Sequence, residues 1–152
     1  MMNITTPLFK HFNDLSADEL HDILQLRLEV FVLEQTCIYQ DLDGKDKDSI
    51  HMVWRDNDQR MIGTCRVLPP GLSYPELSIG RIVTSPSVRG KGLGHQLMRE
   101  VLAYIQANYV GSTSIRISAQ SHLEGFYQSH GFVTTGKEYL EDGIPHMEML
   151  LT

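Results

Sequence analysis

The feature of this sequence that most constrains its fold is a run of three glycines in alternate positions. The run reads Arg89-Gly90-Lys91-Gly92-Leu93-Gly94. It joins a β-prone segment, residues 77–84, to residues 90–108, where apolar side chains recur every four residues and predict a helix. Glycines at such a junction let the backbone turn with its N–H groups exposed, and the helix start adds a positive dipole. Together with the charges of Arg89 and Lys91, this arrangement predicts a site for a pyrophosphate group.

The spacing of these glycines excludes the two most familiar phosphate-binding loops. The Walker pattern GxxxxGK[ST] is absent, and the glycines follow GxGxG rather than the GxGxxG of dinucleotide-binding folds. No carboxylate ends the next predicted strand, where a dinucleotide-binding fold would hold a ribose. A tight strand-to-helix turn that binds no ligand is the alternative interpretation.

The remaining segments alternate between strand-like and helical patterns. Ser16 and Glu19 match a capping box, which predicts a helix over residues 17–33, and the polar residues 34–48 predict a long, partly ordered loop. Gly80 inside a predicted strand indicates a bulge or a close backbone approach. Strands are predicted at residues 7–12, 50–55, 60–68, 77–84, 114–120, 132–139 and 144–151, and a short helix at 122–130. This order predicts a mixed α/β (α+β) fold in which helices cover one mixed sheet.

The size and composition indicate one globular domain. The chain has 152 residues, of which 41% are hydrophobic, and we expect residues 1–152 to form a single domain around one core. No signal peptide and no apolar run of about 18 residues is evident. The two cysteines, Cys37 and Cys65, lack the spacing of a disulfide framework or a CxxC site. We therefore expect a cytoplasmic protein without a membrane partner.

Charge is distributed unevenly along the chain. The net charge is −6, and residues 1–60 carry 6 basic and 12 acidic side chains, residues 61–137 carry 7 and 3, and residues 138–152 carry none and 4. The negative total and the lack of a basic stripe argue against nucleic acid and anionic membranes as partners. A positive centre between acidic segments fits a site that takes both a phosphate-bearing ligand and a cationic partner. Chance clustering on solvated faces gives the same pattern.

The glycine run resembles a signature of the GNAT superfamily of acyl-CoA-dependent N-acetyltransferases. Arg89, Gly92 and Gly94 match its (Q/R)xxGxG/A loop, and residues 126–132, FYQSHGF, are similar to its hydrophobic-Tyr-x-x-x-Gly-Phe element. Further segments resemble the ElaA-like branch: RLEVFVLEQ (27–35), YQDLDG (39–44), IGRIV (79–83), AQSHLEGFYQSHGF (119–132) and DGIPHMEM (142–149). The resemblance covers nearly the whole chain. It implies the GNAT-type fold, a mixed, mostly antiparallel sheet flanked by helices with two central strands splayed apart.

The resemblance also implies acetyl-CoA as cosubstrate and a set of residues that bind it. The pantetheine arm would lie between strands 77–84 and 114–120, and an amide near Val83 would stabilise the oxyanion. Tyr127 would be the general acid that protonates the departing sulfur, unless it is a tyrosine packed in the core. Gln120 stands where the family often has an Asn that contacts the cofactor. The implied binding residues are Ile82, Val83, Thr84, Arg89, Gly90, Lys91, Gly92, Leu93, Gly94, His95 and Gln120.

The general base is not fixed by the sequence. Ile115 occupies the position where some family members carry a Glu. The candidates are Glu34 at the end of the first predicted helix, Asp41, Asp43 and His51, and deprotonation through water is equally open. The carboxylates also fit a solvated loop, and His51 fits an ordinary histidine on a sheet face. We choose Glu34 as the candidate general base, so the expected catalytic residues are Tyr127 and Glu34.

Two functions follow from the resemblance. The first is an enzyme that acetylates a primary amine of a small molecule or peptide by direct attack through a tetrahedral intermediate. The acidic segments favour a cationic, polyamine-like or lysine-like acceptor. The second is a non-catalytic acyl-CoA-binding sensor or interaction module. The oligomeric state stays open, with a homodimer among the options.

We expect no metal in this protein. The seven histidines lack paired ligand spacing. The acidic residues 41–48 do not fit a calcium loop either, because alignment on Gly44 places Tyr39 and Ile50 at the first and last ligand positions.

Overall fold

The fold is built from two antiparallel sheets. The structure is a computed structural model that describes residues 5–111 and 114–152. In the order in which the strands pair, the first sheet contains β1 (Leu8–His11), β2 (Ile50–Arg55), β3 (Met61–Leu68) and β4 (Ser78–Thr84). The second contains β5 (Ile115–Gln120), β7 (Ile144–Leu151) and β6 (Val133–Glu141). The helical elements are α1 (Ala17–Arg27), the π-helical segment η2 (Leu28–Glu34), α2 (Leu93–Asn108), α3 (Glu124–Gln128) and the short turns η1 (Phe12–Asp14), η3 (Asp46–Asp48), η4 (Pro86–Val88) and η5 (Ser121–Leu123).

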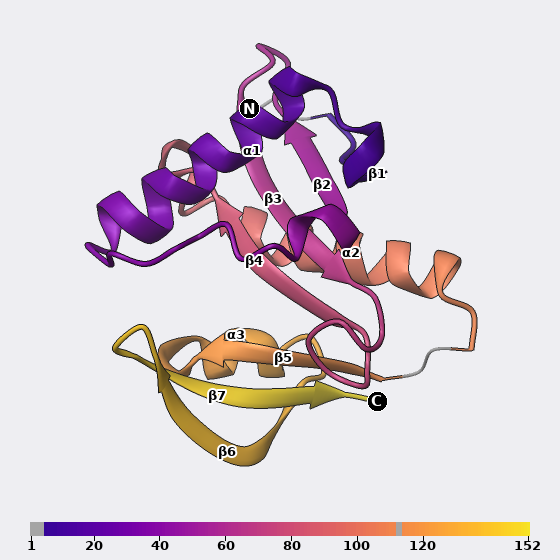
Figure 1. The fold of residues 1–152 in the computed structure, drawn as a ribbon, viewed down its shortest axis with the longest axis vertical. Helices are drawn as coiled ribbons and strands as arrows, with labels where there is room; N and C mark the ends of the chain where they lie inside the picture. Colours follow the sequence, from indigo (N-terminus) through magenta and orange to yellow (C-terminus); the bar gives the residue numbers. More distant parts are fainter. Residues whose placement is uncertain (1–4, 112–113) are drawn as a thin grey trace.

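The two sheets are splayed apart. Among the described residues they are joined by a single parallel bridge, between Leu77 and Ile115. There the Arg116 amide donates to the Leu77 carbonyl at 2.9 Å. From this point β4 and β5 run in the same direction and diverge (Figure 1). The prediction of one mixed sheet is therefore wrong, because the ladder breaks between these two strands, whereas the splay implied by the family resemblance is confirmed.

Strand β4 carries a bulge at the position indicated by Gly80. Thr64 pairs with Val83 and Arg66 pairs with Gly80, so that two residues of β4 face one residue of β3. One of the two is Arg81, whose φ of 48° lies in the left-handed region that non-glycine residues rarely adopt. A bulge bends its strand and re-aims its side chains. This one lies in the wall of the cavity described below.

Helices cover both faces of the first sheet. In Figure 1, α1 lies in front of β3 and β4, and α2 lies behind the sheet. The larger apolar cluster joins α2 to both sheets. A smaller cluster of Leu26, Val30 and Val83 packs α1 and its extension against β4. Within residues 5–111 and 114–152, no helix is both long and apolar enough to cross a membrane.

The helix predicted at residues 17–33 begins as expected and then widens. Ser16 Oγ accepts from the Glu19 amide at 3.0 Å, and Glu19 Oε1 accepts from the Ser16 amide at 2.8 Å, which confirms the capping box. From Leu28 to Glu34 the backbone forms a π-helix, so the α-helical part is shorter than predicted. Such wide turns are rare and occur frequently at functional sites. The widened segment leads directly to Gln35, which lines the cavity.

The acidic loop at residues 34–48 is held to the core by ion pairs. Arg27 is 1% exposed and donates to Asp41 Oδ2 through Nε and to Asp46 Oδ1 through Nη1, both at 2.9 Å. Arg66 reaches the same Asp46 oxygen at 2.9 Å and Asp43 Oδ2 at 2.6 Å. Charged side chains are rarely buried unless they are paired. The interpretation as a solvated loop is therefore wrong for Asp41, which is buried, whereas Asp43 and Glu34 are exposed.

Candidate active site

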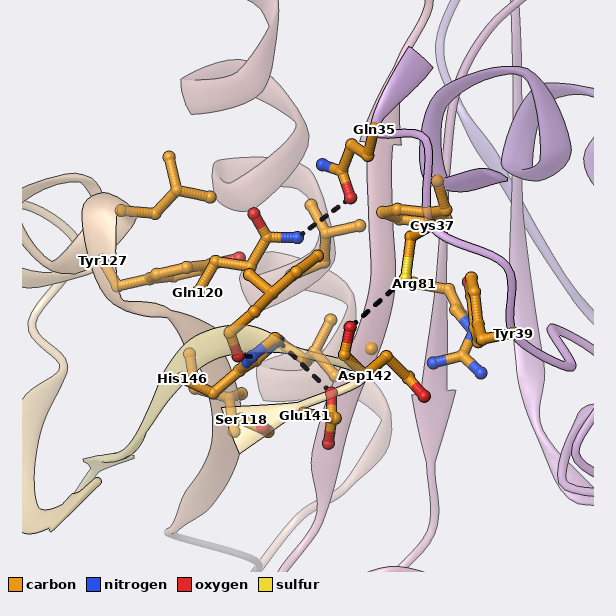
Figure 2. A pocket seen from close by; sticks show the side chains of 17 residues that line it. Gln35, Cys37, Tyr39, Arg81, Ser118, Gln120, Tyr127, Glu141, Asp142 and His146 are labelled. Carbon is orange, nitrogen blue, oxygen red and sulfur yellow. Dashed lines mark hydrogen bonds and ion pairs between the residues drawn. The ribbon is translucent and has the colours of Figure 1, made fainter. Parts of the chain in front are cut away.

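A cavity lies where the two sheets diverge. It encloses about 730 Å³, including its open mouth. Strands β4 and β5, the β6–β7 hairpin, α3 and the segment after the π-helix all contribute to its wall (Figure 2). The polar side chains that line it belong to Gln35, Cys37, Tyr39, Arg81, Ser118, Gln120, Tyr127, Glu141, Asp142 and His146. The cavity therefore combines proton donors, proton acceptors and two carboxylates in one place.

Tyr127 enters this cavity from α3. Its ring packs edge-on against Phe126 and Phe132, with centroids 5.1 and 6.0 Å away, and the residue is 6% exposed. Burial raises the pKa of Tyr127 to about 12, with a smaller contribution from Cys65. In the described part of the chain, no residue hydrogen-bonds its hydroxyl group. Tyr127 thus stays protonated at neutral pH and has a hydroxyl free to serve a ligand.

Gln120 bridges the two walls of the cavity. It is the last residue of β5, and its side-chain amide donates to Gln35 Oε1 at 3.4 Å (Figure 2). The bond is long and joins β5 of the second sheet to the turn that follows the π-helix. A ligand that reaches between β4 and β5 would meet both amide groups, as expected for a residue that contacts a cofactor.

His146 and Glu141 lie in the same cavity, and neither was predicted. His146 faces Gln120 in the β5–β7 register, so both side chains are on one face of the sheet. Its Nδ1 lies 2.7 Å from the Ile144 carbonyl, and its Nε2 lies 3.3 Å from Glu141 Oε2. His146 is 7% exposed, and its ring stacks on Tyr139 at 6.2 Å. The segment DGIPHMEM contained this histidine, but only the pairing of β5 with β7 identifies it as part of a site.

The glycine run forms a second hollow at the N-terminus of α2. Helix α2 begins at Leu93, later than the predicted residue 90, because Gly90 and Gly92 adopt φ values of 79° and 74°. Open space surrounds both glycines, whereas a Cβ on Gly94 would lie 3.4 Å from the Phe126 ring. The residues that line the hollow are Thr84, Val88, Arg89, Gly90, Gly92, Leu93, Gly94, His95 and Phe126. This geometry leaves room for an anion over the helix start.

His95 is paired with His130, which lies in the turn that follows α3. Its Nδ1 lies 2.9 Å from His130 Nε2, so one proton lies between the two rings. Both rings pack near Phe126, at centroid distances of 4.7 and 5.3 Å. These contacts fix the wall of the hollow opposite the glycines.

The end of β4 connects the cavity to the hollow. Ile82 lines the cavity and Thr84 lines the hollow, with Val83 between them. The side chain of Val83 is buried in the small cluster under the π-helix, so a ligand would reach its backbone rather than its side chain. Most of the predicted cofactor-binding residues therefore line one of these two hollows, whereas Lys91 and Val83 line neither.

Arg89 and Glu34 form a bidentate ion pair outside the cavity. Both guanidinium-to-carboxylate distances are 2.6 Å, and each side chain is about two-fifths exposed. The hydrogen bond from Arg89 lowers the pKa of Glu34 below its ordinary value. Glu34 does not line the cavity that holds Tyr127. The two expected catalytic residues are thus not brought together.

The other predicted base candidates are also outside the cavity. Asp41 is occupied by Arg27 and by Arg81, whose Nε donates to Asp41 Oδ1 at 2.9 Å. Hydrogen bonding from Arg66 lowers the pKa of Asp43. Burial lowers the pKa of His51, which bonds the Asp46 carbonyl at 2.8 Å. These groups hold the loop and the bulge of β4 in place.

The described residues, 5–111 and 114–152, contain no group of three or more His, Cys, Asp or Glu side chains placed to hold a metal ion.

Nearly the whole chain matches one family of known proteins. Residues 13–152 match the family model described as an acetyltransferase (GNAT) domain. A UPF0039 protein of Synechocystis sp. is 41% identical over 142 residues, which cover 93% of this chain and 92% of that protein. Protein ElaA of Escherichia coli is 39% identical over 141 residues, 91% of each chain.

Two crystal structures have a very similar backbone. An acyl-CoA N-acyltransferase from Pseudomonas aeruginosa superposes with a TM-score of 0.91 at 39% identity, covering 99% of this chain and 100% of that one. Escherichia coli ElaA superposes with a TM-score of 0.89 at 36% identity, covering 98% and 99%.

Proposed function

Since the chain belongs to the GNAT acetyltransferase family, with ElaA and UPF0039 proteins among its relatives, we propose that it transfers an acetyl group from acetyl-CoA to a primary amine. The GNAT acyl-CoA N-acyltransferase fold and the ElaA relationship agree with the sequence prediction. The observation that carries the proposal is the position of Tyr127. Its unpaired hydroxyl faces a cavity whose β4 wall leads directly to the glycine hollow.

The proposed binding mode follows the end of β4 from the glycine hollow to the cavity. The pyrophosphate lies over Gly90, Gly92 and Gly94, where backbone N–H groups and the start of α2 favour negative charge. Lys91, Leu93 and His95 complete this loop. The pantetheine arm then runs along the backbone of Ile82, Val83 and Thr84, and Gln120 contacts it from β5. Arg89 reaches the phosphates only after it releases Glu34.

The proposed chemistry is direct attack of the amine on the thioester. The tetrahedral centre carries an oxyanion, which a backbone amide near Val83 stabilises. The C–S bond then breaks, and Tyr127 donates its proton to the departing thiolate. A tyrosine carries its proton at neutral pH, as a general acid must, and burial raises the pKa of Tyr127 further, which makes its hydroxyl a weaker acid.

The acceptor is proposed to be cationic. Glu141 and Asp142 line the cavity at the β6–β7 turn, and the last 15 residues carry four acidic side chains and no Lys or Arg. Carboxylates at a cavity mouth attract the ammonium group of an acceptor and disfavour an acceptor that itself carries a carboxylate. Polyamine-like or lysine-like amines are therefore the expected class.

The proposal is tested by binding and turnover in the same preparation. Acetyl-CoA at about 100 times its dissociation constant should stabilise the protein by about 2.7 kcal/mol. Mass spectrometry should then detect an acetylated diamine in the mixture. Binding without any acetylated product from a broad amine panel would indicate the acyl-CoA-binding module instead, and no binding at millimolar CoA would overturn both.

A further inference from the structure

Two groups that can accept a proton, His146 Nε2 and the Glu141 carboxylate, face each other in the cavity near the β6–β7 turn. The short contact between His146 Nδ1 and the Ile144 carbonyl, 2.7 Å, places a proton on Nδ1, because a carbonyl can only accept. In the neutral ring Nε2 then carries a lone pair. Glu141 Oε2 lies 3.3 Å from that nitrogen and also carries a lone pair (Figure 2). The geometry is satisfied only when a proton lies between them or when an N–H donor bridges both atoms from the side.

The imidazole is held rigidly, whereas the carboxylate reaches solvent. His146 is stacked on Tyr139, whose hydroxyl donates to Ser118 Oγ at 2.5 Å. The side chain of Glu141 is 48% exposed, against 8% for that of His146. The pair therefore connects a fixed nitrogen inside the cavity to a carboxylate that can exchange protons with water.

We propose that His146 Nε2 is the general base of the acetyl transfer and that Glu141, which also contacts the acceptor ammonium, relays the proton to solvent. This inference rests on the proposed function. An acceptor ammonium donates one N–H to His146 and another to Glu141, and His146 takes the proton. Glu141 then stabilises the imidazolium and passes the proton to solvent. Both residues line the cavity that also holds Tyr127.

The protons balance in this scheme. The ammonium loses its first proton to His146, and the neutral amine forms the C–N bond to the thioester carbon. The tetrahedral intermediate loses a second proton from nitrogen as the C–S bond breaks. The second nitrogen proton reprotonates Tyr127, which has given its own proton to the CoA sulfur, and the first leaves through His146 and Glu141. The products are the amide, CoA thiol and one released proton.

The charged groups around His146 agree with this role. From β6 it faces Glu141 and Tyr139, and Lys137 lies over the Tyr139 ring at 5.8 Å. From the segment before β4, Tyr74 contacts Tyr139 and is protonated, since burial raises its pKa. The remaining neighbours are Ser118 and Gln120 on β5, Asp142 in the turn, and Glu148 on β7, which is paired with Arg116 at 2.9 Å. Glu141 is the free carboxylate in direct contact.

The competing candidates are engaged elsewhere. Glu34 is bound to Arg89, and Asp41 and Asp43 are bound to arginines of the buried network. His51 is 1% exposed and does not line the cavity. His146 combines a position in the cavity with a nitrogen that lacks a hydrogen in the neutral state.

The test compares kcat/KM for a diamine as a function of pH in wild type, His146→Gln and the control His21→Gln on the exposed face of α1. His146→Gln should lower kcat/KM by about 10²-fold or more above neutral pH, with CoA affinity unchanged. The ratio of wild type to His146→Gln should fall towards one as acid protonates the base that the variant lacks. The titration of the acceptor amine is common to both proteins and cancels in this ratio.

Each outcome decides the matter. A ratio near one at all pH values, with wild type active, overturns the base and leaves the proposed function intact. A wild type that acetylates no amine overturns the proposed function and this inference with it. If the His146→Gln variant does not fold, the Glu141→Gln variant is measured instead. Loss of the carboxylate should move the midpoint of the kcat/KM profile to lower pH, while the affinity for CoA stays unchanged. An unmoved midpoint contradicts the proposal.

Discussion

The guanidinium group of Arg89 holds the carboxylate of Glu34 through two contacts of 2.6 Å, which joins the glycine loop to the end of the π-helix. The residue proposed to bind phosphate is thus already bound to an internal carboxylate. Any phosphate that binds Arg89 must compete with Glu34.

Glu34→Gln should therefore tighten acetyl-CoA binding. The pair is exposed, so the gain should be at most about fivefold and should shrink at high salt. Calorimetric titration at two salt concentrations measures it, with Glu29→Gln on the exposed side of the same segment as control. Weaker binding in Glu34→Gln would mean that the carboxylate supports the site.

Gly92→Val should abolish binding while leaving the fold intact. Gly92 has a φ of 74°, and a β-branched residue there must distort the loop. Gly71→Val is the matched control, because Gly71 has a φ of 91° and open space around it but lies far from the loop in sequence. Both variants should lose about 1–2 kcal/mol of unfolding free energy from backbone strain. Loss of CoA affinity in Gly71→Val as well would refute a specific role of the glycine run.

Tyr127→Phe should slow single-turnover acetyl transfer by about 10²-fold, the low end for general acid catalysis, because a thiolate leaves readily. CoA affinity and stability should change little, since the hydroxyl has no partner among the described residues. Tyr109→Phe, at the end of α2, serves as control. An unchanged single-turnover rate would remove Tyr127 from the mechanism.

Asp46→Asn should destabilise the protein by about 3–5 kcal/mol, because it removes the buried carboxylate that Arg27 and Arg66 share and leaves Arg27 with Asp41 and Arg66 with Asp43 alone. Burial alone would raise the pKa of Asp46, but hydrogen bonds and charge from Arg27 and then Arg66 bring it below its ordinary value. A lowered pKa contributes stability above about pH 4 that is lost as pH falls.

Urea unfolding at neutral and acidic pH checks this expectation. Wild type should lose stability on acidification more steeply than Asp46→Asn, and the exposed Asp48→Asn should behave as wild type. Equal acid sensitivity in Asp46→Asn would show that the network does not couple stability to pH.

Local patterns predicted much of this molecule. The capping box at Ser16, the bulge near Gly80 and the strand-to-helix turn at the glycine run each depend on a few neighbouring residues, so the sequence alone indicates them. The family motifs predicted Tyr127, which lines the cavity, and the glycine loop, which lines the second hollow.

What the sequence missed depends on contacts between distant segments. His146 becomes part of the cavity only through its register opposite Gln120. Asp41 and Asp46 look like loop residues until Arg27, 14 and 19 positions away, is brought beside them. The change from α- to π-helix at Leu28 and the break between β4 and β5 leave no signal in apolar spacing.

The most direct test of the account is one competition experiment. The protein is incubated with isotopically labelled acetyl-CoA and equal amounts of a diamine, lysine and glutamate, and labelled products are quantified by mass spectrometry beside a Tyr127→Phe reaction. The account predicts labelled acetyl-diamine or acetyl-lysine in excess over acetyl-glutamate, at a rate that falls sharply in Tyr127→Phe. Acetyl-glutamate as the main product would contradict the cationic acceptor, and bound acetyl-CoA with no labelled amine above the uncatalysed rate would contradict acetyl transfer itself.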